Sequence, residues 1–344
     1  MAKKTLLVLI ISVGLCTAPR ASAAEMNGQV LTGNAPIAKS TVTLWEASAD
    51  APKQLAQTKT GDDGRFEVRT TGAREDAILY LVASGGEAEA KNGSGDNAAL
   101  VLMTVLQNKP PASVTINELT TVASAFTAAR FINGHAISGN PLGLRIAAGN
   151  VPNLVDPVTG GWGKVLLDPL NSTQTTTLAN LDTLGSLITA FATVADDNWR
   201  ARFFKAATPA AGPAPTSTLE AMAGIAREPW ADPKDLYALF DEAYPLPAPD
   251  GRRGAPFIPY LVYVPDDFAL SLRFSGGGNS AAGRIMFDAD GNVWTGQNWL
   301  PGSQSGVNKS TGGGVSKFSP NGEARRRSWA SLAWASTASA GARP

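Results

Sequence analysis

The sequence predicts a multidomain α+β protein with an N-terminal antiparallel β-sandwich, a central all-α domain and a short C-terminal β unit. Three observations predict this order. Hydrophobic residues recur at every second position across residues 27–86, at helical spacing across residues 115–245, and at every second position again after residue 268. The length of 344 residues leaves room for about two or three domains of ordinary size.

Composition and charge limit the classes of partner. Hydrophobic residues make up 44% of the chain and charged residues 17%, which is enough apolar material for buried cores. Lys and Arg total 29, equal to the 29 Asp and Glu, so the formal net charge is zero. This balance offers no electrostatic attraction for nucleic acid or an anionic membrane, and we expect no nucleic-acid partner.

Residues 1–24 have the organisation of a cleaved signal peptide. MAKK gives a positive start, TLLVLIISVGL an apolar stretch of 11 residues, and Ala21-Ser22-Ala23 a small-residue cleavage site. Because a membrane span needs about 20 apolar residues, we expect no stable span in the mature chain. The sequence predicts a periplasmic or secreted protein, cleaved after Ala23 or Ala24.

Cys16 is the single cysteine of the chain, and it lies within this leader. It could be a lipoprotein anchor, but Leu15 stands before it where a small residue is needed, which favours soluble export. After cleavage the mature protein would have no disulfide, no thiol nucleophile and no cysteine metal site.

Residues 25–112 are predicted to form the β-sandwich and a linker. Alternating segments are GQVL, STVTLWEA, QLAQTKT, GRFEVRT and AILYLVAS, and residues 100–106 are a further strand candidate. Residues 60–66 read as a turn, since Asp and Gly tolerate the backbone angles that a turn needs. Asp62 and Asp63 without a downstream Glu fall short of a calcium loop.

The motifs STVTLWEA and TGDDGRFEV resemble the carboxypeptidase regulatory-like domain, a transthyretin-like sandwich. The resemblance covers residues 27–86, and its turn motif is moderately specific. It implies a non-catalytic adaptor or binding module that accompanies another domain.

Residues 113–245 are predicted to form the all-α domain. Helical spacing is seen at 117–131, 142–148, 176–195, 199–207, 217–227 and 232–243. Thr115 followed by Glu118 suggests a capping box for the first of these helices. Aromatic side chains at helical spacing, Trp199, Phe203 and Phe204, are expected in the core.

This helical segment offers few catalytic groups. His135 is the only histidine, and a helix-end or solvent role is favoured over a base or metal ligand. The adjacent acids at 196–197 and at 266–267 point in different directions and are interpreted as solvated charges. We predict no catalytic, cofactor-binding or metal-binding residues and no cofactor.

Residues 246–322 are predicted to be a linker followed by a single incomplete β-propeller blade. Residues 268–274 alternate as a strand, residues 284–295 form two strands around a DADGN turn, and residues 314–318 form another strand. Asp288 and Asp290 also match the start of a calcium loop, but no further ligands follow, which favours a hairpin turn.

The run IMFDADGNVWTGQN followed by VSKFSPNG resembles blades of NHL-repeat and streptogramin-lyase-like propellers. The pattern is specific for the superfamily but not for one member. Relatives that are lyases use a histidine base at the propeller centre, whereas residues 255–344 contain no histidine. A propeller commonly closes with four to eight blades, and one blade cannot bury its own faces.

Residues 323–344 break the pattern. From residue 324 this tail contains four arginines and no acid, with no alternating strand that resembles a second blade. We expect a disordered or frameshifted end of a longer propeller protein, the alternative being a genuine basic tail.

The sequence therefore favours an exported, non-catalytic binding or scaffold protein with a glycan, peptide or protein ligand, and a truncated form of a longer propeller protein. The alternative is a fragment of a secreted propeller enzyme, streptogramin-lyase-like or calcium-dependent esterase- or lactonase-like, that lacks its active site.

Overall fold

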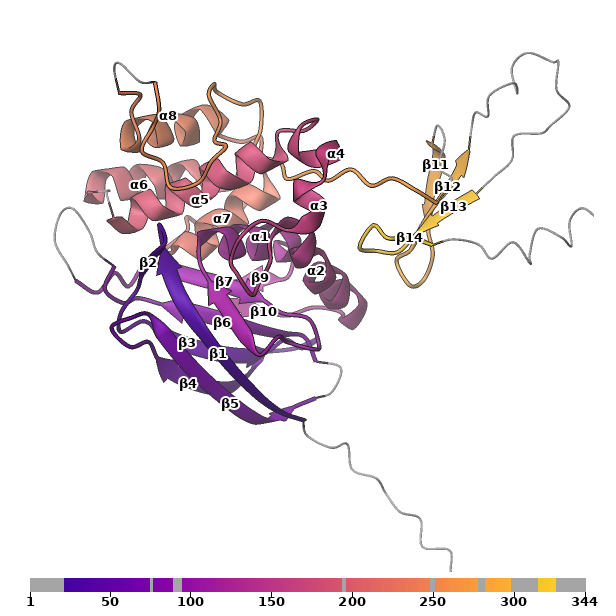
Figure 1. Cartoon of the computed structure of the whole chain (residues 1–344), viewed down its shortest axis with the longest axis horizontal. Helices are drawn as coiled ribbons and strands as arrows, with labels where there is room; N and C mark the ends of the chain where they lie inside the picture. The colour runs from indigo at the N-terminus through magenta and orange to yellow at the C-terminus, as the bar shows by residue number, and fades with distance from the viewer. Residues whose placement is uncertain are drawn as a thin grey trace, which may run out of the picture.

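A computed structural model describes residues 22–74, 77–88, 95–193, 196–247, 251–277, 282–297 and 315–325. Figure 1 shows two β-sheets on one side, a helical layer packed over them, and a small third sheet beside the helices. Helices account for 31% and strands for 27%, which confirms the α+β class. Of the predicted signal peptide, residues 1–21 lie outside the described residues.

Two sheets form the β layers of the main body. The first has the order β2-β1-β5, with β8 pairing β1 in parallel, and the second has the order β4-β3-β6-β7. The bounds are β1 (Ser22–Thr32), β2 (Ala35–Pro36), β3 (Thr41–Glu46), β4 (Lys53–Lys59), β5 (Arg65–Ala73), β6 (Leu79–Ser84), β7 (Val101–Val105) and β8 (Ser113–Ile116). Alternate side chains of both sheets, such as Val30, Val68, Leu44 and Leu81, are buried in the same core.

The helices of the next layer are α1 (Glu118–Ala128), α2 (Pro141–Leu154), α3 (Lys164–Leu167), α4 (Pro169–Ser172), α5 (Thr177–Thr193), α6 (Asp197–Ala206), α7 (Thr218–Arg227) and α8 (Pro233–Ala243). A two-residue hairpin, β9 (Ile132–Asn133) and β10 (Ala136–Ile137), follows α1. Trp199 and Phe203 are buried as expected, and Phe204 packs against the same core. The sequence missed α3 and α4 because each spans a single turn and has no hydrophobic period to detect.

Hydroxyl groups of two helices cap the free edge of β7. An edge strand leaves backbone groups unpaired, and burial makes such groups costly. Here alternate N–H groups of β7 donate to helix hydroxyls at 2.9 to 3.0 Å: Val101 to Thr218, Met103 to Thr121 and Val105 to Ser124. The helices therefore complete the sheet as well as covering it.

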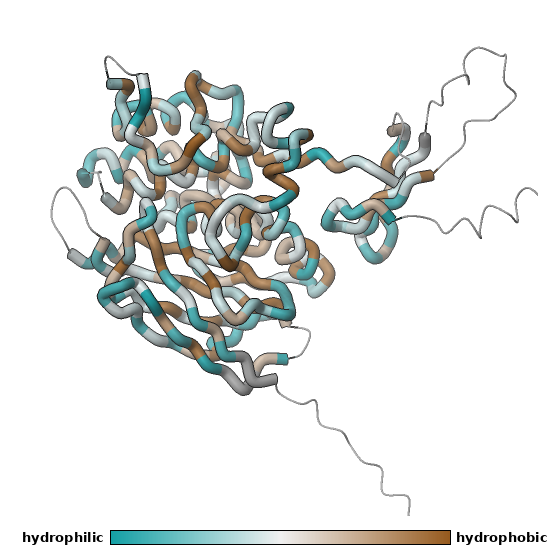
Figure 2. The backbone as a smooth tube through the Cα atoms, viewed as in Figure 1, coloured by the Kyte–Doolittle hydropathy of each residue, from teal (hydrophilic) through white to brown (hydrophobic). Residues whose placement is uncertain are grey.

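This arrangement corrects the predicted boundary at residue 112. Strand β8 lies beyond that position yet pairs β1, so the sheet extends into the segment that was predicted to be all helical. One continuous set of buried residues runs from Met26 in β1 to Phe268. The sandwich and the helices thus share one core. Figure 2 shows hydrophobic residues concentrated where the sheets and helices meet.

The start of α1 differs from the predicted capping box. Asn117 is the N-cap residue, its side chain accepts from the Thr120 amide, and the Thr120 hydroxyl accepts from the Asn117 amide. Glu118 is therefore the first helical residue, and its side chain turns into the core instead of capping. The Thr115 hydroxyl donates to the Val158 carbonyl, away from the helix.

Residues 251–277, here called the strap, run extended across the helices. The strand predicted at 268–274 is wrong, since this segment belongs to no sheet. Side chains of α4 and α5 replace a neighbouring strand, as Asn180 donates to the Ala269 carbonyl and Thr177 to the Ser271 carbonyl. An extended chain shows period 2 whether its partners are strands or side chains, so the sequence pattern did not distinguish the two cases.

The C-terminal sheet has the order β11-β12-β13-β14, formed by β11 (Ala282–Phe287), β12 (Val293–Gln297), β13 (Val315–Phe318) and β14 (Ala324–Arg325). It lies beside α2, where Asn150 and Asn153 donate to the carbonyls of Pro320 and Asn321. Strand β14 occupies the first residues of the predicted tail, and residues 326–344 lie outside the described residues.

The DADGN segment is a hairpin turn closed by its first acid. The Asp288 carboxylate accepts from the amides of Asp290 and Asn292, from the Trp294 indole and from the Lys317 ammonium group. These donors, the Trp294 indole above all, hold the pKa of Asp288 well below its usual range. Because protein donors already occupy both oxygens of this carboxylate, the structure favours a hairpin turn over a calcium loop.

In the part of the chain that the structure describes, no helix combines the length and the hydropathy that crossing a membrane requires.

Candidate ligand-binding pocket

A cavity of about 530 Å³ opens between α7, the β9–β10 hairpin and the loop that precedes α7. We call it the Trp230 pocket. Its volume falls within the range of about 300–1,000 Å³ that is usual for small-molecule sites. The lining residues are Arg130, Ile132, Asn133, Gly134, Pro209, Ala211, Gly212, Pro213, Ala214, Pro215, Glu220, Ala223, Gly224, Arg227, Glu228 and Trp230.

Two acids of α7 and its C-cap fasten the proline-rich loop 209–216 that forms one wall. The Glu228 carboxylate accepts from the Ala210 amide at 2.8 Å, near the start of the loop. The Glu220 carboxylate accepts from both the amide and the hydroxyl of Thr216 at 2.7 Å, at its end. Burial alone would raise the pKa of Glu220, but the Thr216 donors and His135 outweigh it and lower that pKa. The wall is therefore held in place without a ligand.

Gly224 allows the loop to enter close to α7. A Cβ atom at this position would lie 2.2 Å from the Ala207 carbonyl oxygen, which is closer than any real contact. Together with Ala223 it leaves the floor of the pocket without a large side chain.

The two arginines of the pocket have different roles. Arg227 donates from Nε to the Ala129 carbonyl at 3.0 Å and from Nη2 to the Ile132 carbonyl at 2.6 Å, which ties α7 to the end of α1. Arg130 is exposed and makes no hydrogen bond or ion pair within the described ranges. Burial, and then the neighbouring positive charge of Arg130, lower the pKa of Arg227. The pocket thus holds one guanidinium that is used internally and one that is free.

Trp230 supplies an open aromatic surface at the rim. Its side chain is 66% exposed, although tryptophan is mostly buried in folded proteins. The segment that carries it is fixed, because the Ala231 amide donates to the Glu228 carbonyl and the Phe268 amide to the Pro229 carbonyl. An exposed aromatic on a fixed backbone loses little freedom when a ligand packs against it.

His135 lies next to this pocket, in the β9–β10 turn. Its Nε2 is 3.3 Å from the Ser217 hydroxyl oxygen, and burial lowers its pKa, which favours the neutral ring. A neutral ring protonated on Nδ1 accepts from the serine. Ser217, however, is only 3% exposed and is the N-cap of α7, where it accepts from the Glu220 amide. The pair has the spacing of a base and a nucleophile, but the serine is buried and already committed to the helix.

One acid of each adjacent pair considered in the sequence has a local structural partner. Asp63 accepts from the Arg65 amide in its turn, and Asp196 caps α6 by accepting from the Trp199 amide. Asp267 accepts from the Ala269 amide. Across the described ranges, no group of three or more His, Cys, Asp or Glu residues is placed to hold a metal ion.

Two carboxyl groups, of Glu118 and Asp182, are buried although nothing in the sequence predicted their burial. Glu118 Oε1 accepts at 2.7 Å from the Thr32 hydroxyl, the Gly33 amide and the Thr189 hydroxyl. Asp182 Oδ1 accepts from the Trp162 indole at 2.7 Å. The second oxygen of each group is buried without a hydrogen-bond partner among the described residues. Burial raises both pKa values, to about 7 for Asp182.

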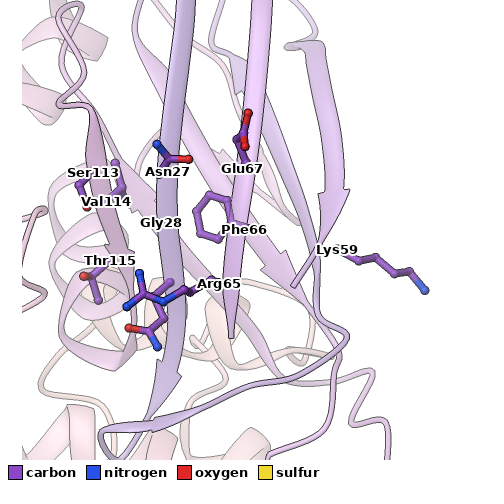
Figure 3. A pocket seen from close by; sticks show the side chains of 10 residues that line it. Asn27, Gly28, Lys59, Arg65, Phe66, Glu67, Ser113, Val114 and Thr115 are labelled. Atoms are coloured by element: carbon purple, nitrogen blue, oxygen red, sulfur yellow. The ribbon is translucent and has the colours of Figure 1, made fainter. Parts of the chain in front are cut away.

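A second hollow, of about 470 Å³, lies on the sheet formed by β1, β5 and β8 (Figure 3). Gly28 lies opposite Phe66 on the paired strands, and the Phe66 ring occupies the space that a side chain at Gly28 would need. In Figure 3 the Lys59 side chain points away from the hollow. The other charged residues of its lining, Arg65 and Glu67, form ion pairs with Asp63 and Arg69. We therefore assign the candidate site to the Trp230 pocket.

The sequence did not predict the Trp230 pocket. Its lining residues come from separate parts of the chain, at 130–134, 209–215, 220–228 and 230. Only the tertiary fold brings these parts together. One signal was available, because the segment around Pro229 and Trp230 lies between two predicted helices, where an aromatic residue has no helical face to occupy.

No family model matches the chain, and no curated protein matches it. A solved structure that it matches in part is a 9R-lipoxygenase from Cyanothece PCC8801, with 15% identity and a TM-score of 0.20. The match covers 31% of this chain and 17% of the lipoxygenase.

Proposed function

We propose that the protein is an exported, non-catalytic binding protein whose Trp230 pocket takes a sugar unit of a glycan. The observation that carries the proposal is the exposed Trp230 indole at the rim of a pre-formed, polar-lined pocket. The C–H groups of a pyranose ring form an apolar face that packs on an indole, while its hydroxyls require polar partners close by. Asn133 and Arg130 offer such partners.

A glycan fits the pocket better than an extended peptide does. Peptides commonly bind by adding a strand to a free sheet edge or by laying an apolar helix face into an apolar groove. The only strand residues in the lining are Ile132 and Asn133, and both already pair with β10. The lining also combines charged, amide and small residues, so it provides no continuous apolar groove.

A binding role is favoured over catalysis by the state of Ser217. Ser217, which has His135 beside it, is buried and caps α7. A substrate would therefore have to displace the first turn of α7 to reach its hydroxyl. Turnover of ester, peptide and glycoside substrates is therefore expected to be absent. Hydrolysis that disappears in a His135→Ala variant would overturn the non-catalytic proposal.

We also propose that β1–β8 correspond to the carboxypeptidase regulatory-like module and β11–β14 to a propeller blade. Two packed sheets with one shared core support the first assignment. A four-stranded antiparallel meander with exposed Ile285 and Phe287 supports the second, because blades bury such residues against neighbouring blades. The Trp230 pocket lies outside both modules, since its lining residues fall between 130 and 134 and between 209 and 230. The blade would pack its exposed face on further sheets.

The proposal is tested by isothermal titration against a panel of defined oligosaccharides, chosen from a glycan array. Trp230→Ala should weaken binding of the best ligand by about tenfold or more, because the sugar would lose the apolar area that it buries on the indole, at about 25 cal/mol per Å². Tyr263→Ala is the matched control, since Tyr263 is 62% exposed on the strap and outside the pocket lining. Equal affinity of the two variants would contradict the assignment of the site.

A further inference from the structure

The charged groups of the Trp230 pocket are not equivalent, and their hydrogen bonds separate them. Glu220 and Glu228 each use a carboxylate oxygen to hold the wall loop at Thr216 and Ala210. Arg227 uses Nε and Nη2 to hold the carbonyls at the end of α1. Each of these three charges already serves the fold of the protein.

Arg130 is the exception. It follows the last turn of α1, lines the pocket and is exposed, and it has no partner within the described ranges. Besides burial, its positive charge lowers the pKa of the neighbouring Arg227, whereas the Glu220 carboxylate acts on Arg227 in the opposite direction. Arg130 is thus the cation of the lining that no protein acceptor holds within the described ranges. A guanidinium is a planar fork of donors whose geometry matches a carboxylate with two hydrogen bonds.

We propose that the pocket selects acidic sugars, with the carboxylate of a uronic acid bound by Arg130 while its ring packs on Trp230. This inference rests on the proposed function, and it adds the charge of the ligand. The residues fit the two parts of such a sugar, since an apolar ring face meets the exposed indole and a carboxylate meets the free guanidinium. The neutral amide of Asn133 and the backbone of Gly134 remain for ring hydroxyls.

The fastened wall makes this selection effective. A ligand that had to order the loop 209–216 would lose affinity to that ordering, whereas here both ends of the loop are bound by α7 and its C-cap before the ligand arrives. Binding then has to order the exposed Arg130 and Trp230 side chains but not the loop. The charge-assisted hydrogen bond can therefore contribute most of its strength to affinity.

The test is a titration of the full chain with tri-galacturonic acid and with the same trisaccharide carrying methyl-esterified carboxyls. The two probes differ in charge and share the sugar rings. We expect the acid to bind about tenfold more tightly than the ester, from the strength of a charge-assisted bond. Arg130→Gln should reduce affinity for the acid to that for the ester and leave the ester unaffected.

Arg145→Gln is the matched control, because Arg145 is also exposed and has no hydrogen-bond or ion-pair partner among the described residues, but lies on α2, outside the pocket lining. It should bind both probes as the unmodified protein does. Equal binding of acid and ester, or an Arg130→Gln variant that retains the preference, would overturn the acidic-sugar inference and leave the glycan proposal standing. If neither probe nor any neutral oligosaccharide binds, the glycan proposal itself fails.

Discussion

Replacing the buried Asp182 by Asn should change how stability depends on pH. The carboxyl is fully buried, and among the described residues it accepts only from the Trp162 indole and leaves its second oxygen without a partner. Burial therefore raises its pKa from 3.8 to about 7. The folded state holds the proton more tightly than the unfolded state, so this group's stabilising contribution is complete below about pH 4 and is lost as pH rises through about 7.

The magnitude follows from the two pKa values. Each pKa unit corresponds to about 1.4 kcal/mol, so the loss between pH 4 and pH 7 amounts to at most about 4 kcal/mol. Asp182→Asn keeps an oxygen for the Trp162 donor and cannot ionise. Relative to the unmodified protein, the variant should therefore gain stability as pH rises from 4 to 7, by up to about 1.4 kcal/mol per pH unit.

The assay is urea unfolding at each half pH unit between 4 and 8, and the quantity compared is the difference in unfolding free energy between the variant and the unmodified protein. The difference removes the contribution of Glu118, which is buried in both. Asp197→Asn is the control, because the Asp197 side chain is fully exposed to solvent. A difference for Asp182→Asn that is independent of pH would refute the reasoning, since it would show that the carboxyl is ionised inside the folded protein.

Two further changes test how the sheets are closed. Thr121→Val removes a hydroxyl that accepts from β7 and should destabilise the protein by about 1–3 kcal/mol in urea unfolding, whereas Thr127→Val, whose hydroxyl bonds only its own helix, should change stability by less. Equal effects would show that the edge cap contributes little. Gly28→Ala places a Cβ atom 2.3 Å from the Phe66 ring. It should destabilise the protein by about 1–3 kcal/mol and so lower the midpoint of thermal unfolding. Gly296→Ala meets open space and should leave the midpoint unchanged. A Gly28→Ala midpoint equal to that of the unmodified protein would contradict the contact.

Strong periodic segments were predictable because their pattern depends on local geometry. Val42 and Leu44 alternate with polar neighbours in β3, and the structure places that strand where the sequence did. The helix predicted at 176–195 is α5, since its large hydrophobic residues recur at helical spacing from Leu178 to Phe191, although the structure buries the polar residues between them as well. Such segments carry the same signal in isolation as in the fold.

Features that depend on distant partners were not predictable. Glu118 reads as a capping residue, and only the approach of Thr32 and Thr189 from other elements makes its burial tolerable. Phe268 begins a segment that alternates like a strand but pairs with side chains of a helix. The sequence likewise could not show that Arg227 is held by backbone carbonyls while the nearby Arg130 has no partner among the described residues.

The binding site is tested by mapping backbone amide and tryptophan indole N–H chemical shifts during titration with tri-galacturonic acid. We expect the largest changes at Arg130, Asn133, Gly134 and the Trp230 indole, with smaller changes in the loop 209–216. Changes concentrated instead on the outer face of β1, β5 and β8, or on the C-terminal sheet, would contradict the assignment of the binding site to the Trp230 pocket.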